Sequence, residues 1–159
     1  MNITLICVGR LKEKYWKDAV SEYEKRLSRY CRLKIEEVAD EPAPEQLHDG
    51  DRERVMAKEA ERIRKKIPSG SYVAALAVEG KAFSSEELSA WMDRLWTGSV
   101  SSLTLIIGGS LGIHPSLLKE ADILLSFSRM TFPHQLMRVI TLEQLYRAFK
   151  ISSGEPYHK

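Results

Sequence analysis

Two loops near the end of the sequence combine residue types that suit a ligand site. The apolar run 103–107 ends in the loop 108–112, GGSLG, and the apolar run 123–125 leads into the loop 126–133, SFSRMTFP. Glycine permits positive φ angles and lets a backbone approach a flat ligand closely. Because open α/β sheets bind ligands beyond the carboxyl ends of their strands, the two loops are predicted to form one site.

The loop 126–133 gives the sharper chemical signal. Phe127, Met130 and Phe132 stand among small hydroxyl residues, and they offer an apolar slot in which backbone groups can contact the edge of a purine. A loop that buries its own hydrophobic side chains is the alternative. The glycine loop is equally consistent with a plain turn. It lacks both the G-x-G-x-x-G spacing with a later acid and a following Lys-Ser/Thr, which argues against dinucleotide and P-loop sites.

The C-terminal tail and the histidines are the other candidates for chemistry. Tyr157, His158 and Lys159 carry a phenol, an imidazole and an ammonium group that can contact a base or a phosphate. A frayed terminus is the ordinary expectation for such a tail. The histidines show no metal-ligand spacing, so no metal site is expected. They are His48, His114, His134 and His158.

Alternating apolar runs and helical patterns predict the elements that position these loops. Strands are expected at 2–8, 33–38, 72–78, 103–107 and 123–125, and helices at 11–30, 51–67, 84–95, 114–120 and 134–151. A turn at 79–81 is expected to lead the chain away from the third strand. Strands that alternate with helices indicate an α/β sandwich with a mainly parallel five-stranded sheet, and 159 residues suffice for one domain over 1–159.

The predicted final helix has two apolar stripes, Val139, Leu142, Leu145, Tyr146 and Phe149 on one side and Leu136, Met137 and Ile140 on the other. A surface helix of a small monomer normally buries one stripe. Two stripes favour a two-fold homodimer in which this helix meets a second copy. A helix lodged centrally in its own domain is the alternative.

Composition and charge set limits on partners and location. No apolar stretch approaches the ~20 residues of a membrane span, so no membrane partner is expected. No signal peptide is recognisable, and Cys7 lies in a buried strand pattern, which suits a reduced, cytoplasmic protein. The net charge of +2, with five basic and two acidic residues over 129–159, weakly supports a polyanionic partner. The charged side of the helix 11–30 is interpreted as a solvated face, with an RNA-binding patch as the alternative.

Several unbroken motifs resemble one family. The segments LIIGGS at 105–110, LSFSRMTFPHQ at 125–135, EQLYRAFKI at 143–151 and GEPYH at 154–158, with VGRLK at 8–12, resemble the ribosomal RNA large-subunit methyltransferase H family of the SPOUT class. The resemblance covers the whole chain. It implies S-adenosylmethionine as methyl donor, methylation at N3 of a pseudouridine in a stem-loop of 23S rRNA on the assembled ribosome, a homodimer and a C-terminal trefoil knot.

The same resemblance assigns roles to individual residues. It places around the donor Leu76, Gly108, Phe127, Ser128, Arg129, Met130, Thr131 and Phe132. It matches Arg147, Tyr157 and His158 to positions for RNA binding and catalysis.

Two mechanisms fit these residues. The pseudouridine N3 must lose its proton before it attacks a methyl group. Either His158 takes that proton as general base, or water takes it while Arg147 and Tyr157 stabilise the anion. The donor is expected in one subunit, with the partner helping to form the RNA face. A non-catalytic RNA- or ribosome-binding module of the same fold is the rival function, and a nicotinamide-dependent enzyme is a weaker one.

Overall fold

The computed structural model describes residues 1–158, and these form five strands and five helices. The strands are β1 (Asn2–Val8), β2 (Arg32–Val38), β3 (Tyr72–Ala82), β4 (Ser102–Ile107) and β5 (Ile123–Ser126). The helices are α1 (Lys14–Leu27), α2 (Asp49–Arg64), α3 (Ser85–Thr97), α4 (Pro115–Glu120) and α5 (His134–Ser152).

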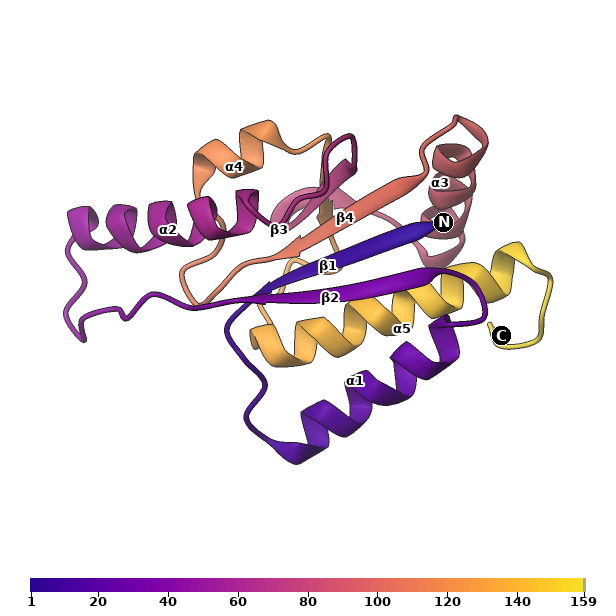
Figure 1. The fold of residues 1–159 in the computed structure, drawn as a ribbon, viewed down its shortest axis with the longest axis horizontal. Coiled ribbons are helices and arrows are strands. Elements are labelled where there is room, and N and C mark those ends of the chain that lie inside the picture. The colour runs from indigo at the N-terminus through magenta and orange to yellow at the C-terminus, as the bar shows by residue number, and fades with distance from the viewer. Residues whose placement is uncertain (159) are drawn as a thin grey trace.

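The strands form one sheet in the order β2-β1-β4-β3-β5, and all the pairings between these strands are parallel (Figure 1). β1 and β4 lie at the interior of the sheet and are buried along almost their whole length. Strands covered on both faces need apolar side chains at nearly every position, which explains the unbroken runs in the sequence. The predicted five-stranded parallel sheet is confirmed.

Helices cover both faces of the sheet. α1, α3 and α5 contribute to one apolar cluster, which contains Leu27, Trp91 and Leu145. α2 and α4 contribute to the other, which contains Ile63 and Leu117. Figure 1 shows α2 and α4 on one side of the sheet and α1 and α5 on the other. The predicted single-domain α/β/α sandwich is therefore confirmed.

The expected turn at 79–81 is wrong. β3 continues to Ala82, and Leu125 of β5 pairs first with Leu76 and, after a register shift, with Lys81. Gly80 lies so close to β5 that a Cβ atom there would come within 2.6 Å of the Leu125 carbonyl carbon. The glycine thus permits a close strand contact instead of ending the strand. The C-terminal trefoil knot stays a prediction.

α5 lies between α1 and α3, which accounts for most of its burial. Leu142, Leu145 and Phe149 of the first stripe are buried. In the second stripe Met137 packs against the core, whereas Leu136 and Ile140 remain half-buried. A central position explains the first stripe, and the homodimer stays a prediction that concerns the second.

Two further expectations concern the thiols and membrane spans. Cys7 and Cys31 are buried and unpaired, and burial raises the pKa of the Cys7 thiol to about 12, so it behaves as a core side chain. No helix within residues 1–158 has the length and hydropathy that a membrane crossing requires.

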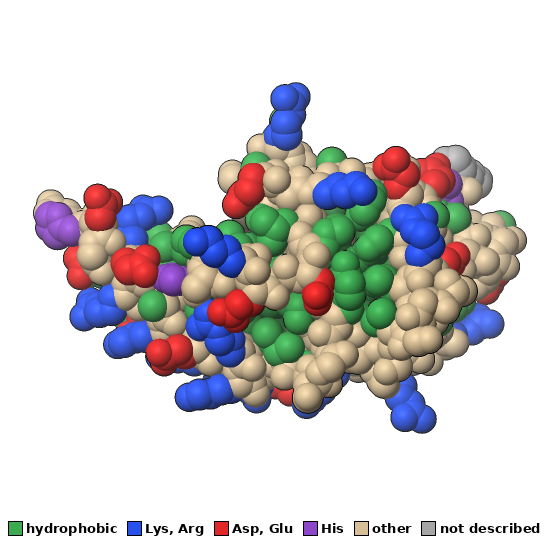
Figure 2. Space-filling model, turned by 90° about the horizontal axis from the view of Figure 1, so that it is seen from above, with side chains coloured by type: hydrophobic (Ala, Val, Ile, Leu, Met, Phe, Trp, Pro, Cys, Tyr) green, Lys and Arg blue, Asp and Glu red, His purple; other side chains and the backbone are tan. Residues whose placement is uncertain are grey.

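The face that carries α2 and α4 has mixed charge. Figure 2 shows acidic and basic side chains interspersed around a central apolar area on this face. Most basic side chains of α2 pair with acids, with Arg62 2.6 Å from Glu41 and Arg64 2.7 Å from Glu120. This pairing makes α2 a poor surface for a polyanion.

Candidate functional site

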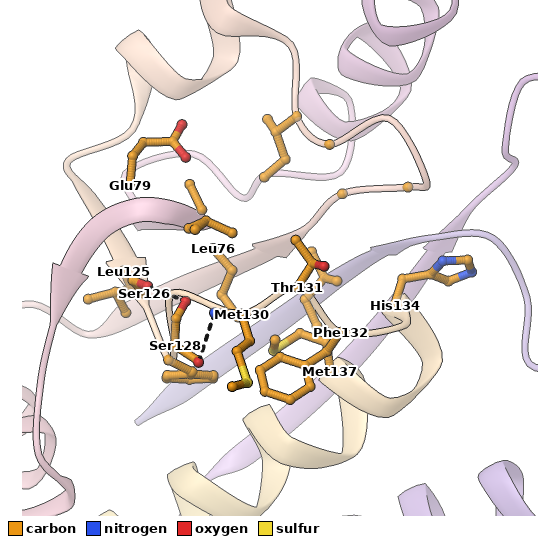
Figure 3. Close-up of a pocket in the computed structure, with 18 of the residues that line it drawn as sticks. Leu76, Glu79, Leu125, Ser126, Ser128, Met130, Thr131, Phe132, His134 and Met137 are labelled. Atoms are coloured by element: carbon orange, nitrogen blue, oxygen red, sulfur yellow. Dashed lines mark hydrogen bonds between the residues drawn. The ribbon is translucent and has the colours of Figure 1, made fainter.

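A cavity of about 740 Å³ opens at the carboxyl ends of β4 and β5, beside the middle of β3. Its walls are residues 76–79, 107–113, 125–128 and 130–134, with Leu118 and Met137 completing them (Figure 3). This volume lies within the range of about 300–1,000 Å³ typical of small-molecule sites. The two loops singled out in the sequence therefore form one concave site.

The glycine loop folds back on itself at the cavity wall. The Gly112 amide donates to the Gly109 carbonyl over 3.0 Å, and Gly112 adopts a φ of +86°. A Cβ atom on Gly108 would lie 2.8 Å from the Gly112 carbonyl carbon and from Cγ1 of Ile113. Glycine is required at 108 because the loop's own backbone already occupies the space of a side chain.

Hydrogen bonds hold the second loop in shape. Ser126 Oγ donates to the Ser128 carbonyl, and the Met130 amide donates to Ser128 Oγ, each over 3.0 Å (Figure 3). The Phe127 side chain packs against the core. Met130 and Phe132 instead stay 74% and 36% exposed at the cavity. The loop thus does not bury all of its hydrophobic side chains, and exposed apolar groups beside a cavity mark a ligand or partner site.

Most residues that the resemblance assigns to the donor line this cavity. They are Leu76, Gly108, Phe127, Ser128, Met130, Thr131 and Phe132. Arg129 is exposed and is not part of the cavity wall among the described residues.

The cavity wall includes Glu79, which sequence reasoning missed, and His134, which it named only among the histidines. Glu79 is its one carboxylate, and the described residues place no Lys or Arg in the wall. Burial and the nearby charge of Arg138 lower the pKa of His134, so its imidazole is neutral at pH 7. A wall with one negative charge suits a cationic or neutral ligand better than a phosphate. Glu79 was hidden because residues 79–81 resemble a turn.

Arg138 is one of the basic residues counted toward a polyanionic partner, but its side chain is only 1% exposed. It lies 2.6 Å from Glu37 and donates to the Gly9 carbonyl over 3.1 Å. It therefore ties α5 to the ends of β1 and β2 and offers no surface to RNA. The sequence signal for this burial was that Arg138 is a single arginine among the apolar residues of a helical pattern.

The tail packs against α5, and the three residues matched to catalysis form one cluster. The Arg147 guanidinium lies 4.7 Å from the centre of the Tyr157 ring, and its Nη1 lies 3.3 Å from His158 Nδ1. His158 Nε2 lies 2.7 Å from Glu86 at the start of α3. The expectation of a frayed tail is therefore wrong for Tyr157 and His158, whereas Lys159 lies outside the described residues.

The electrostatics of this cluster favour hydrogen-bond donors. Burial, followed by Tyr23 and then Glu143, raises the pKa of Tyr157 to about 12, so the phenol keeps its proton near neutral pH. A hydrogen bond to Glu143 raises the pKa of Arg147, which stays cationic. Hydrogen bonds from its own backbone amide, from Ser84 and from His158 lower the pKa of Glu86 to about 2. A cation beside a neutral phenol can stabilise a developing anion.

The cavity lies at the start of α5, whereas the tail cluster lies along the second half of α5 and the segment that follows it. His134 begins the helix at the cavity, and the tail follows its last turn (Figure 1). Met137 of the cavity wall and Arg147 of the cluster are ten residues apart on α5, which is about 15 Å at a rise of ~1.5 Å per residue. A single chain does not bring the predicted donor site and the predicted catalytic residues together.

Comparisons with known proteins agree with this architecture. Residues 1–158 match the family model described as predicted SPOUT methyltransferase. The chain is 60% identical to ribosomal RNA large subunit methyltransferase H of Bifidobacterium adolescentis and 55% identical to the protein of that name from Limosilactobacillus reuteri, over the full length of both sequences in each case. This chain belongs to the SPOUT methyltransferase family.

Proposed function

We propose that this protein uses S-adenosylmethionine to methylate N3 of a pseudouridine in a stem-loop of 23S rRNA, on assembled ribosomes in the cytoplasm. The observation that carries the substrate class is the full-length identity of 60% to a protein named as a large-subunit rRNA methyltransferase. The position on the RNA follows from the motif resemblance, which runs unbroken through 125–135 and 143–151.

The cavity wall fits the proposed donor. S-Adenosylmethionine has a sulfonium and an ammonium group, and Glu79 is the one carboxylate in a wall without Lys or Arg among the described residues. Leu76, Met130 and Phe132 offer apolar surface for the adenine, and the backbone of 108–112 offers hydrogen-bonding groups. When bound, the donor supplies an electrophilic methyl group.

The chain's own residues orient the base and stabilise charge. The N3–H bond breaks, and an N3–methyl bond would form as the sulfur–methyl bond of the donor breaks and leaves S-adenosylhomocysteine, so negative charge develops on the imide as its proton leaves. Arg147 and the protonated Tyr157 are donors suited to that charge. The proton passes either to His158 or to water, and a positioned general base contributes about 10²–10⁴-fold.

We infer further that the working unit is a homodimer, in which the cavity of one protomer faces the tail cluster of its partner. Ten residues of α5, from Met137 in the cavity wall to Arg147 in the cluster, separate the two sites within a chain. Leu136 and Ile140 are half-buried, and Met130 is exposed, so apolar surface for a second copy lies beside the cavity.

Calorimetry and methyl incorporation test the proposed function. We expect S-adenosylmethionine to bind with measurable heat, in competition with S-adenosylhomocysteine. We expect labelled methyl groups to enter intact ribosomes and to map to one 23S pseudouridine, with isolated subunits labelled less. Ribosome binding without donor binding or methyl incorporation would instead identify the non-catalytic binding module.

A further inference from the structure

The Glu143 carboxylate is the point at which the members of the tail cluster meet. Its Oε1 accepts hydrogen bonds from Arg147 Nε over 3.0 Å, from Arg147 Nη2 over 2.6 Å and from the Tyr157 hydroxyl over 3.2 Å. Its Oε2 accepts from Gln144 Nε2 over 2.7 Å. The Glu143 side chain is only 19% exposed, so solvent screens these contacts incompletely.

These bonds restrict how Arg147 can present its charge. A guanidinium has five N–H donors in a fixed plane. Since Nε and Nη2 face Glu143, the Nη1 edge is the part of Arg147 that faces His158. The guanidinium also lies over the Tyr157 ring, so one carboxylate fixes both the cation and the phenol.

We propose that Glu143 is a positioning residue for methyl transfer, which holds Arg147 and Tyr157 as a preorganised pair of donors for the RNA base. The inference rests on the proposed function, because it takes Arg147 and Tyr157 as catalytic residues. Glu143 itself does not touch the base. It acts by removing the rotational freedom of both side chains before the substrate arrives.

A purely structural role is the competing explanation, because Glu143 also fastens the tail. Glu155 provides the matched comparison. Its carboxylate pairs with Lys150 and accepts a hydrogen bond from the Tyr30 hydroxyl over 2.9 Å, and thereby fastens the same tail without touching Arg147 or Tyr157. If tail anchoring were the whole role of Glu143, removing either carboxylate would have the same effect.

The test compares E143Q with E155Q in the full-length protein, using kcat and KM for ribosomes, calorimetric affinity for S-adenosylmethionine, and thermal unfolding. We expect E143Q to lower kcat about 10–100-fold, as misplacement of catalytic groups does, with the donor affinity unchanged within twofold. We expect E155Q to change kcat less than about threefold. Equal losses of kcat in the two variants, or a loss confined to donor affinity, would overturn the inference.

R147A and the double variant E143Q/R147A separate this inference from the proposed function. If Glu143 acts through Arg147 and Tyr157, the loss of kcat in E143Q/R147A is smaller than the product of the two single losses, since effects within one unit are not additive and only the positioning of Tyr157 remains to be lost. Additive losses would overturn the positioning role. An R147A protein with full activity would instead refute the assignment of Arg147 under the proposed function. If E143Q fails to fold, the same comparison with E143D, which keeps the charge on a shorter side chain, decides the question.

Discussion

At the scale of single residues, the site depends on backbone that leaves no room for side chains. Gly108 is the clearest case, because the loop returns to within 2.8 Å of where its Cβ atom would lie. The sequence predicted this requirement for glycine only in part. The sequence indicated a tight turn or a ligand loop, and the structure shows that the turn itself excludes a side chain at the cavity wall.

G108A is therefore expected to lose binding of S-adenosylmethionine and to lower the free energy of unfolding by about 1–3 kcal/mol, the usual cost of an overpacked site. Calorimetry and urea unfolding measure the two effects. G50A is the control, because a Cβ atom at Gly50 meets nothing within 4 Å. Wild-type donor affinity in G108A would contradict the proposed role of this loop.

His134, a residue of the cavity wall, is expected to make the stability of the fold depend on pH. Burial, and then the charge of Arg138, hold its folded-state pKa below the ordinary value, with Asp40 opposing the effect. The unfolded chain takes up a proton as the pH falls through ~6.5 while the folded protein does not. The stability due to this group is complete above that pH and is lost as the pH falls toward the folded-state pKa.

H134Q should therefore show a smaller drop in Tm between pH 7.5 and pH 5.5 than the wild type does. Thermal unfolding at the two pH values provides the comparison, and the other titrating groups are common to both proteins. An equal or larger drop in H134Q would show that His134 is not held neutral in the fold.

Some candidate site residues were predictable from their local sequence and others were not. Phe127, Met130 and Phe132 were predicted because aromatic and Met side chains are unusual in such a loop, whereas Glu143 was not, because its proposed role depends on contacts distant in sequence. Glu143 has the i,i+4 spacing to Arg147 of an ordinary surface ion pair. Only the return of the tail, which brings Tyr157 to the same carboxylate, distinguishes it.

At the scale of elements, one buried ion pair fixes where α5 begins relative to the sheet. Arg138 is almost fully buried, while the Glu37 side chain is 35% exposed. Removing the carboxylate leaves a buried cation with only the Gly9 carbonyl as partner, whereas an exposed pair contributes little.

E37A is expected to lower the free energy of unfolding by about 3 kcal/mol, and urea unfolding measures this change. E22Q, which removes the partner of Arg26 in an exposed pair on α1, is expected to cost less than about 0.5 kcal/mol. Similar small losses in both variants would show that the Arg138 pair does not anchor α5.

The sequence predicted most of the helices and strands, with the second half of β3 as the exception. Apolar runs located β1 and β4 because both faces of these strands are buried. The second half of β3 was missed because Glu79-Gly80-Lys81 resembles a turn, and a glycine needed for close approach to β5 has the same local signature as one that ends a strand.

At the scale of the whole molecule, the main feature is that one chain keeps the cavity and the tail cluster apart. The cavity lies at the start of α5 and the tail cluster along its second half, so a complete reaction site is expected to need two copies. The apolar stripes of α5 hinted at this arrangement, but α1 and α3 bury one stripe within the chain. The C-terminal trefoil knot rests on the family resemblance alone and stays a prediction, because threaded chains are rare and no pattern in the sequence indicates one.

The most direct test is complementation between two inactive variants. M130A/F132A truncates two exposed side chains at the cavity, and R147A removes the cation of the tail cluster. Each homodimer is expected to lose methyl transfer to ribosomes. Co-expressed with different affinity tags and purified as a mixed dimer, the two chains combine one intact cavity with the partner's intact tail. We expect methyl incorporation to recover to about half the wild-type rate, because one of the two composite sites in the mixed dimer is intact. A mixed dimer that assembles but remains inactive would contradict this expectation.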